Sequence, residues 1–199
     1  AEGDGLEARV EDAGVAEALR AGVGGAGWTW PAAPDQNPRQ MPPSRTVYLV
    51  DGSGQFHRAF HAIRGLATSK GLPTNATYGF TTMLRKLLED ERPEHIAVLF
   101  DPPGKTVRHG EYPEYKANRP KMDDALAVQV PYIRRVCEAL RMPVVEIPGY
   151  EADDTIATLA RQAVEKGLKV VVVSADKDLL QLVTDDVLVL NPGREGSGS

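Results

Sequence analysis

Residues 149–178 have the sequence GYEADDTIATLARQAVEKGLKVVVVSADKD, and their pattern shows which elements the fold is built from. After Glu151, apolar residues recur at helical spacing up to Lys166 and Gly167, which form an ordinary helix ending. Lys169–Ser174 is then an apolar run, as expected of a strand that is buried on both faces. Acidic residues stand at the start of the helix and directly after the strand. The stretch therefore predicts a helix followed by a buried strand, with carboxylates beside both.

The same alternation of strands and helices extends through most of the chain after residue 45. Strands are predicted at Thr46–Val50, Ile96–Phe100, Pro143–Ile147 and Lys169–Ser174, with Val187–Leu190 as a candidate fifth strand. Helices are predicted from about Asn75 to Glu91, with Thr74 or Asn75 as the cap, at Asp123–Leu140 and after Glu151. Apolar strands that alternate with helices indicate a parallel sheet covered on both faces. The predicted fold class is a doubly wound, mostly parallel α/β sheet.

Composition divides the chain into three parts. Residues 1–40 are rich in Gly, Ala and Pro and are predicted to be a flexible or non-native extension, although they contain Trp28 and Trp30. Residues 41–192 form the predicted α/β domain, and residues 193–199 a Gly/Ser-rich tail. The net charge is −5, but residues 1–40 hold seven acidic and three basic residues, which leaves 21 acidic and 20 basic residues for the remainder. The net charge therefore does not argue against a nucleic-acid partner.

Several protein classes are disfavoured. The single Cys137 excludes an internal disulfide and a cysteine-cluster metal site, and it fits a reducing, cytoplasmic setting. No apolar run approaches the roughly 20 residues of a membrane span, and the acidic N-terminus lacks a signal-peptide pattern. The four histidines are scattered, so a zinc centre is not expected. Phosphate-binding motifs of P-loop ATPases and of dinucleotide enzymes are absent from the sequence.

Acidic residues follow four of the predicted strands. In parallel α/β sheets, sites form beyond the carboxyl ends of the strands, so these acids should gather at one edge. Such crowded carboxylates repel one another, and oxygen ligands without His or Cys suit Mg²⁺ or Mn²⁺. The candidate metal ligands are Asp51, Asp101, Glu151, Asp153, Asp154, Asp176 and Asp178.

Each acid also has a purely structural interpretation. Asp51 and Asp101 could form turns, Asp176 and Asp178 could cap a short helix, and acids in a first helical turn favour the helix dipole. Lys or Arg side chains, such as Lys177, could supply the counter-charge in place of a metal. Taken singly, every acid allows this interpretation, and only the set favours divalent metal and phosphodiester chemistry with two ions.

A basic segment directly follows Asp101. Residues 104–121, GKTVRHGEYPEYKANRPK, interleave cations with Tyr112 and Tyr115 against only two acids. Cations for phosphates and aromatic rings for base stacking are typical of a nucleic-acid contact, although a solvated basic loop would look similar. The candidate DNA-binding residues are Arg58, on a predicted helix after Asp51, and Lys105, Arg108, Tyr115, Lys116, Arg119 and Lys121.

Five stretches in this order carry a family resemblance: LVDGSGQFHRAFHAI, KGLPTNATYGFTTMLRKLL, AVLFDPPGKTVRHGEYPEYKANRP, PGYEADDTIATLA and SADKDLLQLV. Together they resemble the 5′-nuclease domain at the N-terminus of bacterial DNA polymerase I, in the flap-endonuclease superfamily, over about residues 46–192. The resemblance implies a PIN-like fold and a cytoplasmic, nucleoid-associated bacterial enzyme of replication and repair. That enzyme would use Mg²⁺ or Mn²⁺, two ions in the complete site, to hydrolyse DNA at 5′ ends and 5′ flaps.

The resemblance also implies residue roles. All seven candidate acids match the family's metal site, Arg58 and Lys116 match its catalytic cations, and Arg119 matches a further basic position. Lys116 and Arg108 would lie in a helical arch over the 5′ strand.

Two departures qualify these expectations. His57 stands where the family usually has Tyr. The sequence ends at NPGREGSGS, before the family's helix–three-turn–helix, further aspartates and any polymerase part. The expectation is therefore one metal ion and weak or absent flap cleavage by this chain alone, or completion by a separate C-terminal part. A catalytically dead DNA-binding module and a small-molecule phosphatase remain as alternatives.

Overall fold

The computed structural model describes residues 46–104, 106–107 and 121–192. Its centre is a five-stranded sheet in which every pairing is parallel, with the strand order β3-β2-β1-β4-β5. The strands are β1 (Thr46–Asp51), β2 (His95–Leu99), β3 (Val144–Val145), β4 (Lys169–Val173) and β5 (Val187–Leu190). The predicted N-terminal extension (1–40) and Gly/Ser-rich tail (193–199) lie outside the described residues.

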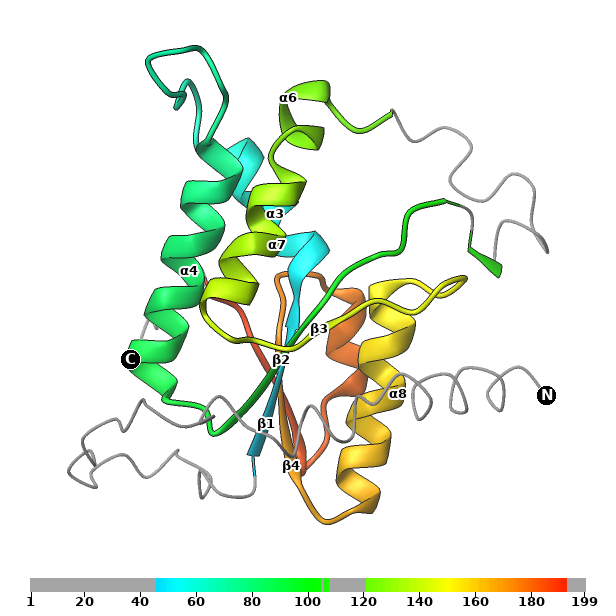
Figure 1. The fold of residues 1–199 in the computed structure, drawn as a ribbon. Helices are drawn as coiled ribbons and strands as arrows, with labels where there is room; N and C mark the ends of the chain where they lie inside the picture. The colour runs from blue at the N-terminus through cyan, green and yellow to red at the C-terminus, as the bar shows by residue number, and fades with distance from the viewer. Residues whose placement is uncertain (1–45, 105, 108–120, 193–199) are drawn as a thin grey trace.

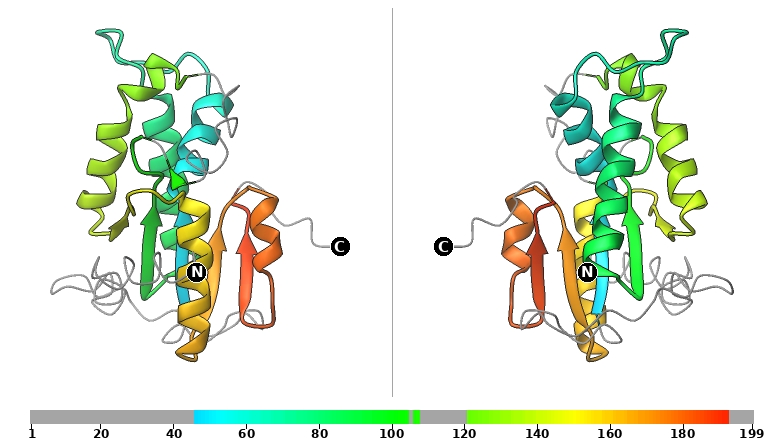
Figure 2. Two further views of the ribbon diagram at one scale, coloured as in Figure 1. Left: turned by 90° about the vertical axis from the view of Figure 1, so that its right-hand side faces the viewer. Right: turned by 90° about the vertical axis from the view of Figure 1, so that its left-hand side faces the viewer.

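Helices cover both faces of this sheet, as predicted (Figure 1). They are α3 (Gly52–Ala62), α4 (Asn75–Glu91), α6 (Asp124–Ala127), α7 (Val130–Ala139), α8 (Ala152–Glu165) and the 3-10 helix η2 (Asp178–Leu182). Helices α4 and α7 lie side by side on one face, and α8 lies on the other face (Figures 1 and 2). None of the described helices has both the length and the apolar character needed to cross a membrane.

Alternating residues of the strands build two separate cores. In β1, Val47 and Leu49 pack with residues of α8, whereas Tyr48 and Val50 pack on the side of α3, α4 and α7. Because successive strand residues point to opposite faces, continuous apolar strands are the sequence pattern that such a doubly covered sheet requires. The predicted fold class is therefore confirmed, and the sheet is parallel throughout.

Two predicted elements differ from the structure. The helix predicted over Asp123–Leu140 is interrupted, with α6 ending at Ala127 and α7 starting at Val130. Pro131 cannot donate a helical hydrogen bond, so it is accepted only in the first turn of a new helix. The strand predicted over Pro143–Ile147 is reduced to Val144–Val145 at the edge of the sheet.

The break between α6 and α7 is held by a buried side chain. Gln129 is fully buried, and its Nε2 donates to Asn75 Oδ1 at 2.9 Å and to the carbonyl oxygen of Ala125 at 2.8 Å. Its Oε1 accepts from the backbone N–H of Thr77 at 3.1 Å. Asn75 in turn donates to two carbonyl groups near the end of α3. One amide network thus fixes the start of α4 against α3 and α6; Thr74, at the cap position, makes no side-chain cap.

Candidate active site

Asp51 lies where β1 ends and α3 begins. Its side chain is buried, and Oδ1 accepts from the backbone N–H of Gly54 at 2.8 Å, which caps α3. Oδ2 accepts from the hydroxyl of Ser174 at 2.7 Å, across to the end of β4. Burial raises the pKa of Asp51 above its usual range despite these two hydrogen bonds, and the nearby charges of Asp101 and Asp176 act in the same direction.

Asp101 follows β2 and connects three elements. Its backbone N–H donates to the hydroxyl of Ser53, the second residue of α3, at 2.8 Å. Its carboxylate Oδ1 accepts from the backbone N–H of Ala152 at 2.8 Å, the first residue of α8. A carboxylate from a neighbouring strand therefore satisfies one of the unpaired N–H groups at this helix start. Glu151, the residue at the cap position itself, makes no side-chain cap and is buried.

Asp153 shows that the acids from different elements are close together. Burial and the negative charges of Asp51, Asp176, Asp101 and Glu151, in that order, raise the pKa of Asp153 to about 6. None of the charges that shift this pKa is positive. We call these five residues, Asp51, Asp101, Glu151, Asp153 and Asp176, the acid edge. They come from the ends of β1 and β2, the start of α8 and the segment after β4.

Asp154 and Asp178 are less closely involved. Asp154 is half-buried in the first turn of α8, and Asp178 is exposed at the start of η2. The backbone N–H of Asp178, the first residue of η2, donates to Asp176 Oδ1 at 2.9 Å, while Lys177 occupies the cap position of η2. Neither Asp154 nor Asp178 is among the charges that raise the pKa of Asp153. The structure thus groups five of the seven predicted acids electrostatically.

Two buried serines, which the sequence analysis did not select, connect the strands of the acid edge. Ser174 donates to Asp51 and accepts from the backbone N–H of Asp176 at 3.0 Å, while Ser53 accepts from Asp101. Ser174 directly follows β4 and Ser53 lies two residues after β1, and these positions were the only signal in the sequence. Because each hydroxyl joins groups from two strand ends, these serines help to fix where the carboxylates stand.

The predicted cations are placed less completely. Arg58 lies on α3, as predicted, and its Nη1 donates to Asn191 Oδ1 at 2.8 Å. Lys121 is 3.9 Å from Asp124, with both side chains more than nine-tenths exposed, so this ion pair contributes little to stability. His57 has its ring centroid 4.7 Å from that of Phe56. The other predicted DNA-binding residues lie outside the described residues: Lys105, Arg108, Tyr115, Lys116 and Arg119.

The start of the basic segment is nevertheless connected to the acid edge. The backbone N–H of Val107 donates to the carbonyl oxygen of Gly149 at 2.8 Å. Gly149 lies two residues before Glu151 and has a φ of +91°, a conformation that favours glycine. The segment that follows Asp101 therefore contacts, at Val107, the loop that leads into α8. This contact places the start of the basic segment next to the acid edge, as expected for a segment that takes part in the site.

Comparisons with known proteins agree with this arrangement. Residues 46–198 match the family described as 5′-3′ exonuclease, N-terminal resolvase-like domain. A 5′-3′ exonuclease of Aquifex aeolicus is 51% identical over 148 residues, covering 74% of this chain and 51% of the relative. DNA polymerase I of Mycobacterium tuberculosis is 51% identical over 149 residues, covering 74% of this chain and 16% of the relative. The chain thus spans about half the length of the first relative and a smaller share of the polymerases.

Solved structures give the same result. The T5 D15 protein, co-crystallised with metal ions, matches with a TM-score of 0.53 and 26% identity, covering 73% of this chain and 53% of that one. The match of the family model to most of the chain and the similarity of the fold lead to one conclusion. The chain belongs to the 5′-3′ exonuclease family and contains the N-terminal part of its nuclease domain.

Proposed function

We propose that this chain contains the metal-binding site of a 5′-nuclease that hydrolyses phosphodiester bonds at the 5′ ends and 5′ flaps of DNA. The observation that carries the proposal is the acid edge, where burial and carboxylates from four parts of the fold raise the pKa of Asp153 to about 6. The carboxylates of the acid edge are partly buried and would repel the negatively charged phosphates of DNA. A cation at this position is therefore required to neutralise them before DNA can bind. Membership of the exonuclease family supports the proposal.

The residues of the acid edge fit a hard divalent cation. All of their side-chain donors are carboxylate oxygens, which Mg²⁺ and Mn²⁺ prefer. In the described part of the chain, no three His, Cys, Asp or Glu side chains already surround one metal position. The carboxylates are therefore gathered at one place without being closed around an ion. Asp51, Asp101, Glu151, Asp153 and Asp176 would hold the ion, with Asp154 and Asp178 as further candidates.

A bound Mg²⁺ would supply an activated water and would stabilise negative charge on the phosphodiester. The chain's own residues have separate tasks. The acid edge keeps its carboxylates close together, and the backbone N–H of Ala152 at the start of α8 binds one of them, that of Asp101. Arg58 and the cations of the basic segment, among them Lys116, would bind phosphates of the DNA strand and orient it. The T5 D15 flap endonuclease, whose solved complex contains DNA and metal ions, supports this assignment by its shared fold.

A second function keeps the fold but not the chemistry. This second candidate is a catalytically weak or dead DNA-binding module, with a C-terminal nuclease or polymerase part as its partner.

Cleavage of a 5′-labelled flap DNA with Mg²⁺ or Mn²⁺ separates the two functions. Asp153→Ala should abolish the metal-dependent product, whereas Asp185→Ala, at an exposed site before β5, should leave it unchanged. DNA binding without product in the folded wild-type chain would favour the binding module. Turnover of a chromogenic phosphomonoester without action on DNA would contradict both and indicate a small-molecule phosphatase.

A further inference from the structure

Arg58 is held by a side chain from the other end of the described chain. Its Nη1 donates to Asn191 Oδ1 at 2.8 Å, and 133 positions separate the two residues. Arg58 lies on α3, the helix that Asp51 caps, so its guanidinium is connected to the same part of the fold as the acid edge. Asn191 follows β5 directly. The contact therefore joins an edge strand to the helix that carries a predicted phosphate-binding cation.

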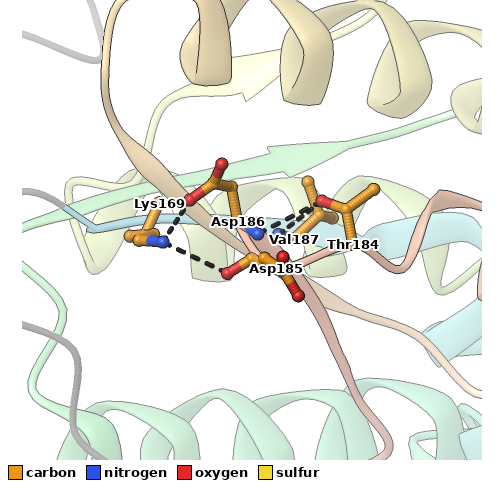
Figure 3. A network of polar contacts seen from close by, with 5 residues as sticks. All are labelled: Lys169, Thr184, Asp185, Asp186 and Val187. Atoms are coloured by element: carbon orange, nitrogen blue, oxygen red, sulfur yellow. Dashed lines mark hydrogen bonds and ion pairs between the residues drawn. The ribbon is translucent and has the colours of Figure 1, made fainter.

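Contacts at both ends of β5 hold the strand that leads to Asn191. At the start of the strand, Lys169 Nζ contacts Asp186 Oδ1 and donates to the carbonyl oxygen of Asp185 at 3.1 Å (Figure 3). The Thr184 hydroxyl accepts from the backbone N–H groups of Asp186 and Val187 at 3.2 Å and 3.1 Å (Figure 3). At the end of the strand, the backbone N–H of Ser174 donates to the carbonyl oxygen of Leu190 at 3.0 Å.

Leu190 also packs on the core that contains Phe56 of α3. The end of β5 is therefore anchored on the α3 side of the sheet, and Asn191, the first residue after the strand, reaches Arg58 from there. These contacts fix the register of β5 and the face of the sheet toward which Leu190 points. The contact between Asn191 and Arg58 is therefore a consequence of the tertiary fold.

The chemistry of the partner is informative. Asn191 is a neutral acceptor, and within residues 46–104, 106–107 and 121–192 Arg58 forms no ion pair with a carboxylate. A guanidinium has five N–H donors, so one bond to an amide leaves most of them for another ligand. An amide orients the group without neutralising its charge, whereas a carboxylate would compete with a phosphate for it.

We propose that Asn191 is a positioning residue that orients the Arg58 guanidinium for a DNA phosphate beside the acid edge. The inference rests on the proposed function, because it assigns the phosphate to a DNA strand. A long, flexible arginine loses side-chain freedom when it binds, and a preformed hydrogen bond removes part of that cost before DNA arrives.

A double-mutant cycle tests the inference in the full chain. The probe is a fluorescein-labelled DNA with a phosphorylated 5′ flap, and its affinity is measured by fluorescence anisotropy. Asn191→Ala should weaken binding about three- to tenfold, as expected for one orienting hydrogen bond. Arg58→Ala should weaken it more, and adding Asn191→Ala to Arg58→Ala should have no further effect. Asn191→Asp should weaken binding more than Asn191→Ala, because the new carboxylate pairs with the Arg58 guanidinium and competes with the DNA phosphate for it.

Salt dependence and a matched control distinguish positioning from simple destabilisation. Arg58→Ala and Asn191→Asp should lower the slope of log affinity against log salt by about 0.9, the value for one lost phosphate contact. Ile133→Val removes a methyl group from the buried side of α7, away from β5, so it should leave affinity and slope unchanged while lowering the melting temperature. A loss of affinity in Ile133→Val equal to that in Asn191→Ala would overturn the inference.

The remaining outcomes separate the inference from the function on which it rests. If Arg58→Ala binds as the wild type does, the proposed DNA contact of Arg58 is wrong, and the positioning role falls with it. If Arg58→Ala weakens binding but Asn191→Ala does not, only the positioning role is wrong. Without DNA, ¹⁵N-arginine NMR should show slowed rotation of the Arg58 guanidinium, lost in Asn191→Ala. Unrestricted rotation in the wild-type chain would contradict the inference directly.

Discussion

Asp153 illustrates how much a single residue depends on its neighbours. The sequence places it in the first turn of a helix, where an acid is ordinarily favourable. In the folded chain, burial and four surrounding carboxylates make its ionised form unfavourable, and its pKa rises to about 6. The residue therefore reports on the acid edge as a whole.

The stability of the metal-free chain should reflect this shift. Asp153 has a pKa of 3.8 when unperturbed and about 6 when folded, so between these values the folded form binds more protons than the unfolded form. Raising the pH through this window lowers the free energy of unfolding, and the loss is complete above about pH 6. Asp153→Asn should remove this loss. We expect the variant to melt above wild type at pH 7.5 in EDTA.

At pH 4 the same comparison should show little difference, since Asp153 is then largely protonated in the folded chain. Melting curves of both proteins at the two pH values, without divalent metal, provide the measurement. A variant that melts below wild type at pH 7.5 would show that Asp153 is not destabilised by its surroundings. Asp185→Asn, at an exposed site, is the control and should give no pH-dependent difference.

At the scale of elements, α3 is pressed closely against β2. A Cβ atom at Gly52 would lie 2.6 Å from Phe100 Cε1 and 2.9 Å from the carbonyl oxygen of Leu99. A backbone oxygen in a central strand cannot move away easily. The close approach also places Asp51 and Ser53, on either side of Gly52, between the ends of β4 and β2.

Gly52→Ala should therefore destabilise the chain even though alanine favours helices. We expect a loss of about 1–3 kcal/mol or more, the usual cost of inserting a methyl group into a filled core. Urea unfolding measures it. His61→Ala, on the exposed side of the same helix, should stay within about 0.5 kcal/mol of wild type. Equal stability of Gly52→Ala and wild type would mean that α3 can move away from β2.

The junction of α4, α6 and α7 depends on Gln129. Gln129→Ala would leave Asn75 Oδ1 and the backbone N–H of Thr77 without their partner in a buried place. We expect a destabilisation of about 2–4 kcal/mol, from the lost bonds and the unsatisfied groups. Gln181→Ala, at an exposed position, is the matched control. If both variants unfold at the same urea concentration, the network does not hold these helices together.

For the whole molecule, the acid edge links folding to metal binding. Its carboxylates come from four separate parts of the fold, so they are together only when the sheet is complete. A cation that binds this arrangement but not the unfolded chain must stabilise the folded state by mass action.

Mn²⁺ or Mg²⁺ should accordingly raise the melting temperature of the wild-type chain. At 100 times the dissociation constant, the stabilisation is about 2.7 kcal/mol, which corresponds to several degrees for a domain of this size. Asp153→Ala should lose most of this increase, and Asp185→Ala should retain it. Differential scanning calorimetry with and without metal gives the comparison. An equal increase in all three proteins would indicate nonspecific binding and contradict a site at the acid edge.

Local pattern determined most of the elements. The bounds of α4 and β5 were predicted to the residue, and β1, β2 and β4 to within one residue at each end. These predictions succeeded because apolar periodicity and the strand–helix alternation are written directly in the chain. The interruption at Gln129 was missed, although Pro131 was a usable signal, because the apolar pattern continues across it.

The sequence by itself determined the α/β class and the presence of acids at one edge, since parallel strands present their carboxyl ends together. Only the tertiary structure decided which groups meet there. The Ser174–Asp51 and Arg58–Asn191 hydrogen bonds join residues 123 and 133 positions apart, and no local propensity specifies such pairs. They arise because β4 pairs with β1, β5 pairs with β4, and α3 packs over that part of the sheet.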